Sequence, residues 1–203
     1  MQQIKSKNIE VEIRARLDNT TEFRKVLNTI GVKQVSSLYV HDIYFCLKTA
    51  NKVEDVEMNK IGSYSLRLRK SKKEGENEHI TINTKTITNY GDHNAWEEHE
   101  VEVNDFLEAA EILDTTEFKP FFELEKTRYV YALDSMEICV EDIIDFGGAV
   151  EVEIMSLKGE ENSAKEKILD FLNKCNISNE HIVPKSITNI IMKERAFKQE
   201  ITI

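Results

Sequence analysis

The sequence predicts an α+β or closed-barrel fold rather than a doubly wound α/β sheet. About eight strand-like segments and three or four helical segments occur, in the order strand, helix, many strands, helix, strands, helices. A length of 203 residues suits one domain of ordinary size. Two prolines and seven glycines leave little room for a flexible linker, so we expect a single domain over residues 1–203.

The first half of the chain begins with a strand and a helix. Residues 9–17 alternate strictly between apolar and charged side chains, which is the period of a strand. Asn19 or Thr20 can cap the following helix, and Gly31 is placed to end it in the left-handed conformation. Residues 48–61 are polar and predict a loop. Further strands are expected over residues 35–47, 63–70, 78–85 and 96–103.

The second half combines a short helix, three strands and a helical C-terminus. Asn104 can cap the short helix. Ser163 and Glu166 have the spacing of a capping box and predict the start of a longer helix, and Ser186 can cap a last one. Strands are expected over residues 118–133, 136–143 and 149–155, the last two forming a hairpin through Gly147-Gly148.

Composition narrows the classes of partner. A formal net charge of −10 argues against sequence-independent nucleic-acid binding, which requires a basic surface. No run of about 18 apolar residues is present, so no transmembrane helix is expected. The first residues lack the apolar core of a signal peptide, and the three cysteines form no CxxC pair. We therefore expect a cytoplasmic protein with neither a nucleic-acid nor a membrane partner.

The strands carry like-charged residues at alternate positions. A sheet with one solvent-exposed face explains most such alternation in proteins. From the pattern alone, we weigh this interpretation about equally against a face that binds a ligand. These faces, however, contain almost only Glu, Arg and Lys, with acidic pairs on some strands and basic pairs on others. The residues concerned are Glu10, Glu12, Arg14, Arg16, Arg67, Arg69, Asn83, Lys85, Glu98, Glu100, Glu102, Lys126, Arg128, Glu141, Glu151 and Glu153.

A barrel with these faces inside would enclose many charges. Buried charge is costly unless it is paired or bound to a ligand. Arg and Lys bind phosphate oxygens, and carboxylates bind Mg²⁺ or Mn²⁺, which prefer oxygen ligands. The pattern therefore indicates a polyanionic ligand with a divalent metal.

The five histidines show no spacing such as HExxH, so no zinc site is expected. Cys139 is interpreted as a core cysteine rather than a nucleophile.

Several motifs in order resemble the CYTH family, also called triphosphate tunnel metalloenzymes, which includes class IV adenylyl cyclase and thiamine triphosphatase. The first strand resembles the family's ExExK signature, with Arg14 in place of Lys. The resemblance extends from residue 9 to about residue 191. The other segments that carry it are Asp42–Phe45, Leu66–Arg69, Ile82–Lys85, Glu98–Val103, Glu125–Tyr131 and Phe146–Ile154.

The resemblance implies an eight-stranded antiparallel β-barrel that forms a tunnel, with helices packed outside, and Mg²⁺ or Mn²⁺ as the cofactor. It also implies residue roles. A homodimer is suggested by the resemblance alone. Expected catalytic residues are Glu10, Glu12, Lys126 and Arg128. Expected substrate ligands are Arg14, Arg16, Arg67, Arg69, Lys85, Lys126 and Arg128. Expected metal ligands are Glu10, Glu12, Glu100, Glu141, Glu151 and Glu153.

Three functions follow from this resemblance. The favoured one is a class IV adenylyl cyclase-like reaction, in which ATP gives cyclic AMP and pyrophosphate. A triphosphatase acting on inorganic or thiamine triphosphate is the first alternative, and a non-catalytic triphosphate or nucleotide binder is the second. The binder is motivated by departures from the family pattern at Arg14, at Glu141 where Asp is frequent, and at Ile187 where Tyr is common. A barrel held only by internal salt bridges is the structural alternative.

Overall fold

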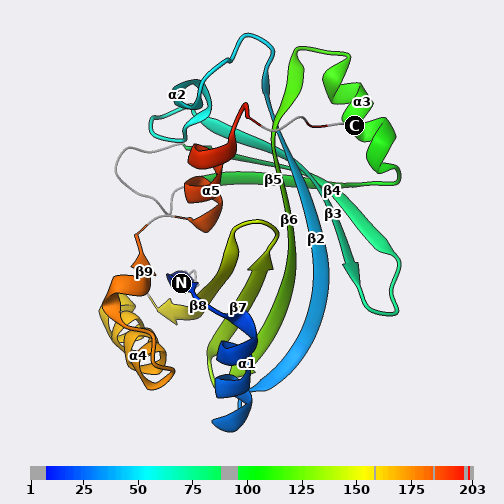
Figure 1. Ribbon diagram of the computed structural model, residues 1–203. Coiled ribbons are helices and arrows are strands. Elements are labelled where there is room, and N and C mark those ends of the chain that lie inside the picture. Colours follow the sequence, from blue (N-terminus) through cyan, green and yellow to red (C-terminus); the bar gives the residue numbers. More distant parts are fainter. Residues whose placement is uncertain (1–7, 88–95, 158, 185, 199–200, 202–203) are drawn as a thin grey trace, which may run out of the picture. The chain divides into compact units, whose positions relative to one another are not determined.

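The computed structural model describes residues 8–87, 96–157, 159–184, 186–198 and 201 (Figure 1). Side chains of residues 8–10 and 96 are outside this description. The chain divides into two compact units. Unit 1 consists of Met1–Ser37 and Thr127–Ile187, and unit 2 of Leu38–Lys126 and Thr188–Ile203. The long strands β2 (Lys33–Leu47) and β6 (Phe118–Leu133) contribute residues to both, and Ile187, the first residue of helix α5 (Ile187–Arg195), belongs to unit 1.

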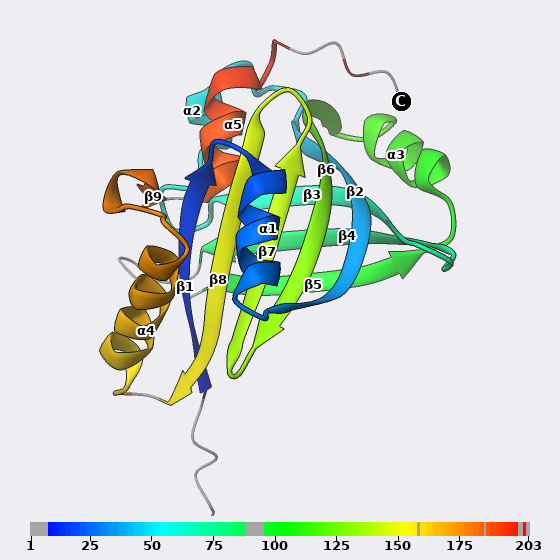
Figure 2. The same cartoon turned by 60° about the horizontal axis from the view of Figure 1, so that its bottom comes forward.

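Unit 1 is an antiparallel sheet with strand order β6-β7-β8-β1-β9. Helix α1 lies across β7 and β8, and helix α4 lies beside β1 (Figure 2). A 3₁₀ turn precedes the short edge strand. The elements are β1 (Asn8–Leu17), α1 (Thr20–Thr29), β7 (Met136–Ile143), β8 (Gly147–Leu157), α4 (Glu161–Lys174), η1 (Asn179–His181) and β9 (Ile182–Val183).

One face of the unit 1 sheet is apolar and forms a core with these helices. The alternation along β1 directs Ile13 and Ala15 to this face, and Val150 and Val152 of β8 pair directly with them. Helices α1 and α4 cover the face with apolar side chains, which removes it from water. The buried helical residues of this core include Phe23, Leu27, Ala164, Ile168, Phe171 and Leu172.

Gly148 allows helix α1 to begin directly against β8. A Cβ at this position would lie 2.6 Å from Thr20 Cγ2 and 2.9 Å from Leu17 Cβ, distances that real Cβ atoms do not adopt. The β7–β8 turn was expected at Gly147-Gly148, but both residues belong to β8 and the turn lies over residues 144–146. Asp145 adopts the left-handed conformation there, which Asp tolerates better than most residues.

Unit 2 is a second antiparallel arrangement, with strand order β5-β4-β3-β2-β6. Helix α3 packs against β3, where Ala109 and Ala110 meet Leu66 and Leu68 in a second core. The elements are α2 (Val53–Val56), β3 (Tyr64–Lys73), β4 (Glu78–Ile87), β5 (Trp96–Val103), α3 (Phe106–Asp114) and α5 (Ile187–Arg195).

The predicted α+β class is confirmed, and three strands have the predicted bounds, residues 96–103, 118–133 and 136–143. The sheet contains nine strands rather than eight, because the two-residue strand β9 is too short to produce a sequence pattern. Its order runs from β5 to β9, and no pairing between these two strands is found in the described residues. The sheet is therefore open as described. Barrel closure and a single domain over residues 1–203 both stay predictions.

The capping box expected at Ser163 is wrong. Helix α4 begins at Glu161, so Ser163 lies inside its first turn. Gly159 has a positive φ of 97° and redirects the chain after β8, and its N–H donates to the Glu161 carboxylate at 2.7 Å. In contrast, Asn19 caps α1 as expected by accepting from the Glu22 N–H.

None of the described helices has the length and apolar character required to cross a membrane.

The division of each strand into an apolar and a polar face predicts a stability difference. Val152 is completely buried in the core of unit 1, whereas Val101 on β5 is 59% exposed. Val152→Ala should lower the free energy of unfolding by about 1–3 kcal/mol, and Val101→Ala by less than about 0.5 kcal/mol. Urea denaturation of both variants measures this. Equal losses would show that the apolar face is not the core.

Candidate functional site

The polar face of unit 1 lies on the side of β1 and β8 opposite the core. In the β1–β8 register Glu12 pairs with Glu153 and Arg14 with Glu151. In the β7–β8 register Glu137 pairs with Glu153 and Cys139 with Glu151. Residues directly opposite each other in an antiparallel pair share a face, so the predicted alternation of charges is confirmed for these strands.

Three predicted metal ligands come together on this face. Carboxylate oxygens of Glu12, Glu151 and Glu153 all lie within 4.8 Å of one another, and the three residues are half-buried. Arg14 contacts this cluster, since its Nε donates to Glu151 at 2.6 Å and its guanidinium also pairs with Glu12. Burial alone would lower the pKa of Arg14, but the charges of Glu151 and Glu12 outweigh it and raise that pKa.

The chemistry of this cluster fits a hard divalent cation. Mg²⁺ and Mn²⁺ prefer oxygen ligands, and three carboxylates from two neighbouring strands can supply them without a large rearrangement. Five carboxylates and three guanidinium groups project from this face of β1, β6, β7 and β8 among the described residues, so negative charge is in excess. The residues are Glu12, Glu137, Glu141, Glu151, Glu153, Arg14, Arg16 and Arg128.

Glu141 is held by an arginine rather than by the carboxylate cluster. Arg128 donates to Glu141 from Nε at 2.8 Å and from a terminal nitrogen at 2.5 Å. Burial opposes the charge of Arg128, but Glu141 raises the pKa of the guanidinium above its ordinary value. Burial raises the pKa of the neighbouring Cys139 thiol to about 12. Cys139 therefore stays a thiol at neutral pH, as expected for a residue that is not a nucleophile.

The other two predicted residues of unit 1 are less constrained. Arg16 is exposed, and its guanidinium lies over the Phe146 ring at 4.5 Å from the centroid. This cation–π contact holds Arg16 on the same face as Arg14. Glu10 pairs with Met155 in the register, but its side chain lies outside the described residues.

In unit 2, two predicted phosphate ligands, Arg67 and Arg69, lie beside the buried carboxylate of Asp42. Arg69 donates to both carboxylate oxygens of Asp42, at 2.6 and 2.8 Å, and Arg67 Nε lies 3.9 Å from the same carboxylate. Asp42 is fully buried. Burial would raise its pKa, but the hydrogen bonds and charge of Arg69, with help from Arg67 and Lys126, hold that pKa below its usual range. Asp42 therefore stays charged, fixes Arg69 through two hydrogen bonds and attracts Arg67.

Arg67 retains an unused donor. Its Nε is buried and, among the described residues, has no hydrogen-bond partner. A buried unsatisfied donor costs about 1–3 kcal/mol, so such a group is retained where a ligand can supply the acceptor. The guanidinium also interacts with the buried Tyr44 hydroxyl. A phosphate oxygen is the acceptor that best suits an arginine in this setting.

The remaining predicted residues of unit 2 differ in burial. Lys126 is only 4% exposed. Lys85 is half-exposed, with its Nζ 3.1 Å from Glu98, which also accepts from Asn83 at 2.6 Å. Although burial opposes the effect, these two partners lower the pKa of Glu98. Glu100 is exposed and accepts from the Thr81 hydroxyl at 3.5 Å.

A cavity of about 430 Å³ lies in unit 2 beside Tyr44. Its walls include Tyr64, Phe121 and Met192, and Asn189 of α5 adds a polar group. Small-molecule sites commonly have about 300–1,000 Å³ and this mixture of apolar walls with a few polar groups. Because Tyr44 interacts with Arg67, the cavity adjoins the polar face that carries Arg67 and Arg69.

The sequence pattern predicts the charged residues of the candidate site but not the residues that hold them in place. Asp42 and Tyr44 belong to a motif that resembles the family, but the pattern assigns neither of them a role in the site. Their parity on β2 opposite Arg69 and Arg67 could have indicated both, but only once the β2–β3 register is known. The individual roles assigned to the charged residues stay predictions.

Comparison with known proteins identifies the family. The CYTH domain model matches residues 8–187. A protein of Methanocaldococcus jannaschii named "Putative adenylate cyclase" is 27% identical over 88% of this chain and 95% of its own. The structure of a Pyrococcus horikoshii protein covers 92% of this chain and all of its own with a TM-score of 0.71 at 21% identity.

A further solved structure, from Hippeastrum, is described as a "Putative adenylyl cyclase" that "reveals a dominant" triphosphatase activity. It has a TM-score of 0.64 at 15% identity and covers 92% of this chain and 97% of its own. Both structural likenesses concern the fold. The family assignment rests on the domain model, which spans most of the chain, and we conclude that the protein belongs to the CYTH family.

Proposed function

We propose that the protein is a divalent-metal-dependent enzyme that converts ATP to a cyclic nucleotide and pyrophosphate. The observation that carries the proposal is the cluster of Glu12, Glu151 and Glu153, whose carboxylates lie within 4.8 Å of one another on a polar sheet face. Arg14 offsets only part of this negative charge, and a divalent cation would balance the rest, so the cluster suits metal binding.

The basic residues supply the second part of the proposal. Arg67 has a buried donor available for a phosphate oxygen, and Asp42 holds Arg69 next to it. Within unit 2 we assign phosphate binding to Arg67, Arg69, Lys85 and Lys126, and within unit 1 to Arg14, Arg16 and Arg128. A divalent cation, when bound, would neutralise phosphate charge and orient the triphosphate.

The cavity beside Tyr44 supports a nucleoside triphosphate over inorganic triphosphate. Its volume and its aromatic walls suit a base and ribose, and inorganic triphosphate has neither group to occupy it. In the proposed reaction the ribose 3′-oxygen attacks the α-phosphorus, the 3′-proton leaves, and pyrophosphate departs. Lys126, which is buried, and Arg128, which is half-buried, would stabilise the charge that develops on the phosphoryl oxygens.

A triphosphatase is the second candidate, and a single site can serve both reactions. Water would then attack the terminal phosphorus, with the same cationic residues stabilising the charge. The triphosphatase activity described for the Hippeastrum protein motivates this candidate. A binder without turnover is the third, motivated by Arg14, which presents a planar fork where the family signature has Lys.

Product analysis tests the proposal directly. We would incubate the protein with ATP, thiamine triphosphate or inorganic triphosphate, each with Mg²⁺ or Mn²⁺, and separate the products by chromatography. Cyclic AMP with equimolar pyrophosphate is the expected result. Orthophosphate without a cyclic product would instead establish the triphosphatase. Absence of turnover with all three substrates would refute both enzymatic candidates.

Removing one carboxylate of the cluster should abolish metal-dependent turnover. Glu153→Gln keeps the size of the side chain but removes one negative oxygen ligand, and we expect at least about a 100-fold loss of activity at fixed metal concentration. The loss should be partly recovered at higher Mn²⁺. Glu166→Gln on the exposed surface of α4 is the matched control. Equal activity of the two variants would remove Glu153 from the metal site.

Arg67 should control the affinity for the triphosphate. Arg67→Ala removes a charge-assisted contact of about 1.5–3 kcal/mol, which corresponds to a rise of roughly 10- to 150-fold in the KM for ATP. Arg67→Lys should recover only part of this, because a lysine lacks the planar fork. Lys72→Ala, at an exposed position on the same strand, is the control. An unchanged KM in Arg67→Ala contradicts the assignment.

A further inference from the structure

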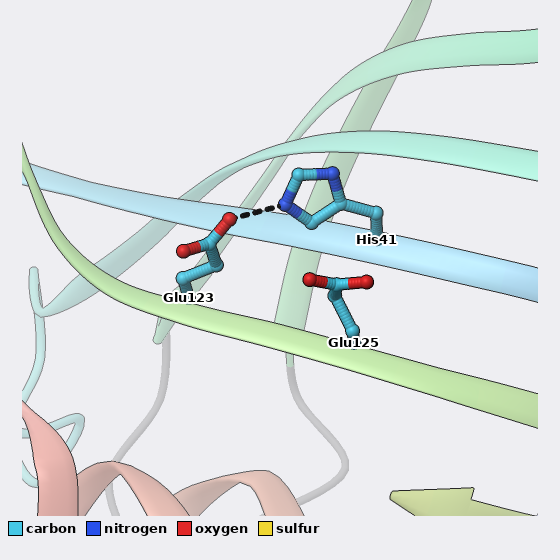
Figure 3. Close-up of side chains that lie close together, drawn as sticks. All are labelled: His41, Glu123 and Glu125. Carbon is cyan, nitrogen blue, oxygen red and sulfur yellow. Dashed lines mark hydrogen bonds and ion pairs between the residues drawn. The ribbon is translucent and has the colours of Figure 1, made fainter. Parts of the chain in front are cut away.

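A second group of metal-ligating side chains lies in unit 2. His41 of β2 and Glu123 and Glu125 of β6 place one ligand atom each within 4.8 Å of one another. Figure 3 shows the imidazole directed toward Glu123, with the Glu125 carboxylate beneath the ring. This group is distinct from Glu12, Glu151 and Glu153, which belong to unit 1.

The group lies on the opposite sheet face from the proposed phosphate ligands of unit 2. His41 and Asp42 are consecutive on β2, so their side chains point to opposite faces. Asp42 holds Arg69 on the polar face, whereas the His41 ring lies 5.3 Å from Phe106 of α3. The group therefore has no part in the triphosphate chemistry proposed above.

We propose that His41, Glu123 and Glu125 form a Zn²⁺ site that links β2 to β6. One imidazole nitrogen with two carboxylates is a mixed nitrogen and oxygen ligand set, which suits Zn²⁺ better than Mg²⁺. Three protein ligands leave a fourth coordination position for water or an external ligand.

The distances require only a small adjustment. His41 Nε2 lies 2.6 Å from the nearer Glu123 oxygen. Ligands at 2.0–2.1 Å from a tetrahedral Zn²⁺ lie about 3.3 Å apart, so the two side chains must separate by less than about 1 Å. His41 and Glu123 are both partly exposed, with side-chain exposures of 14% and 28%, which allows this movement and gives an ion access.

Neighbouring residues orient two of the ligands. The Tyr39 hydroxyl donates to Glu125, and burial together with this hydrogen bond raises the pKa of Tyr39. The Phe106 ring packs on one side of the His41 ring. Lys70 pairs with His41 in the β2–β3 register, but its ammonium group lies over the Phe106 ring, at 4.9 Å from the centroid. Such outer contacts are typical of metal sites, where they fix the ligands before the ion binds.

Histidine spacing along the chain predicts no zinc site, because the ligands come from two strands that are 82 residues apart in sequence. The competing interpretation is a simple ion pair between His41 and Glu123. His99 and Glu97 on β5 provide such a pair within this chain, at 3.1 Å and without a third ligand in the described residues. The two histidines can therefore be compared directly.

The test measures ZnCl₂ binding by isothermal titration calorimetry of the full chain carrying Glu153→Gln, which weakens the unit 1 cluster. We expect one equivalent of Zn²⁺ per chain, and excess Mg²⁺ should not compete with it. Adding His41→Gln or Glu125→Gln should weaken binding at least about 100-fold, and adding Tyr39→Phe about 10-fold. Adding His99→Gln should change nothing.

Two results would overturn the site. One is the absence of Zn²⁺ binding at about 100 µM, a concentration far above the dissociation constants typical of structural zinc sites. The other is equal binding after His41→Gln and His99→Gln. Circular dichroism of each variant without metal establishes that it is folded. Because His41 lies outside the proposed catalytic face, His41→Gln with the native Glu153 should retain triphosphate turnover, so failure of the zinc site and failure of the proposed function are separate outcomes.

Discussion

The register between β1 and β8 is the constraint on which the rest of unit 1 depends. It places Glu12 opposite Glu153 and Arg14 opposite Glu151, while Ile13 and Ala15 meet the apolar residues of β8 on the other face. A slip of one residue would move every charge into the core and every core residue to the polar face. Gly148 supports this register, because only a residue without Cβ lets the start of α1 pack against β8 there.

Strand pairing also explains how the polar faces hold so many charged side chains. Most basic residues of the polar faces are paired internally, as in Arg14 with Glu151, Arg69 with Asp42 and Arg128 with Glu141. These pairs offset part of the cost of desolvation, and they also fix the directions of the side chains. A phosphate or a metal ion would then meet groups that are already oriented, which reduces the entropy lost on binding.

The sequence allowed the faces to be predicted, because strand alternation is local and residues such as Glu151 and Glu153 reveal their common side by spacing alone. What depends on the pairing of remote strands could not be predicted. Asp42 becomes a positioning residue only when β3 brings Arg69 beside it. His41 meets Glu123 only because β6, which carries Glu123, is the neighbour of β2 in the sheet. The capping box at Ser163 was wrong because Gly159 redirects the chain before the helix begins.

The central claim is that the charged faces bind a metal-associated triphosphate and are not merely internal salt bridges. The most direct measurement is the melting temperature as a function of inorganic triphosphate concentration, with and without Mg²⁺ or Mn²⁺. The account predicts stabilisation that grows with triphosphate, reaches about 2.7 kcal/mol at 100 times the Kd, and is stronger with the metal. A melting temperature that does not change with triphosphate in either metal would contradict it.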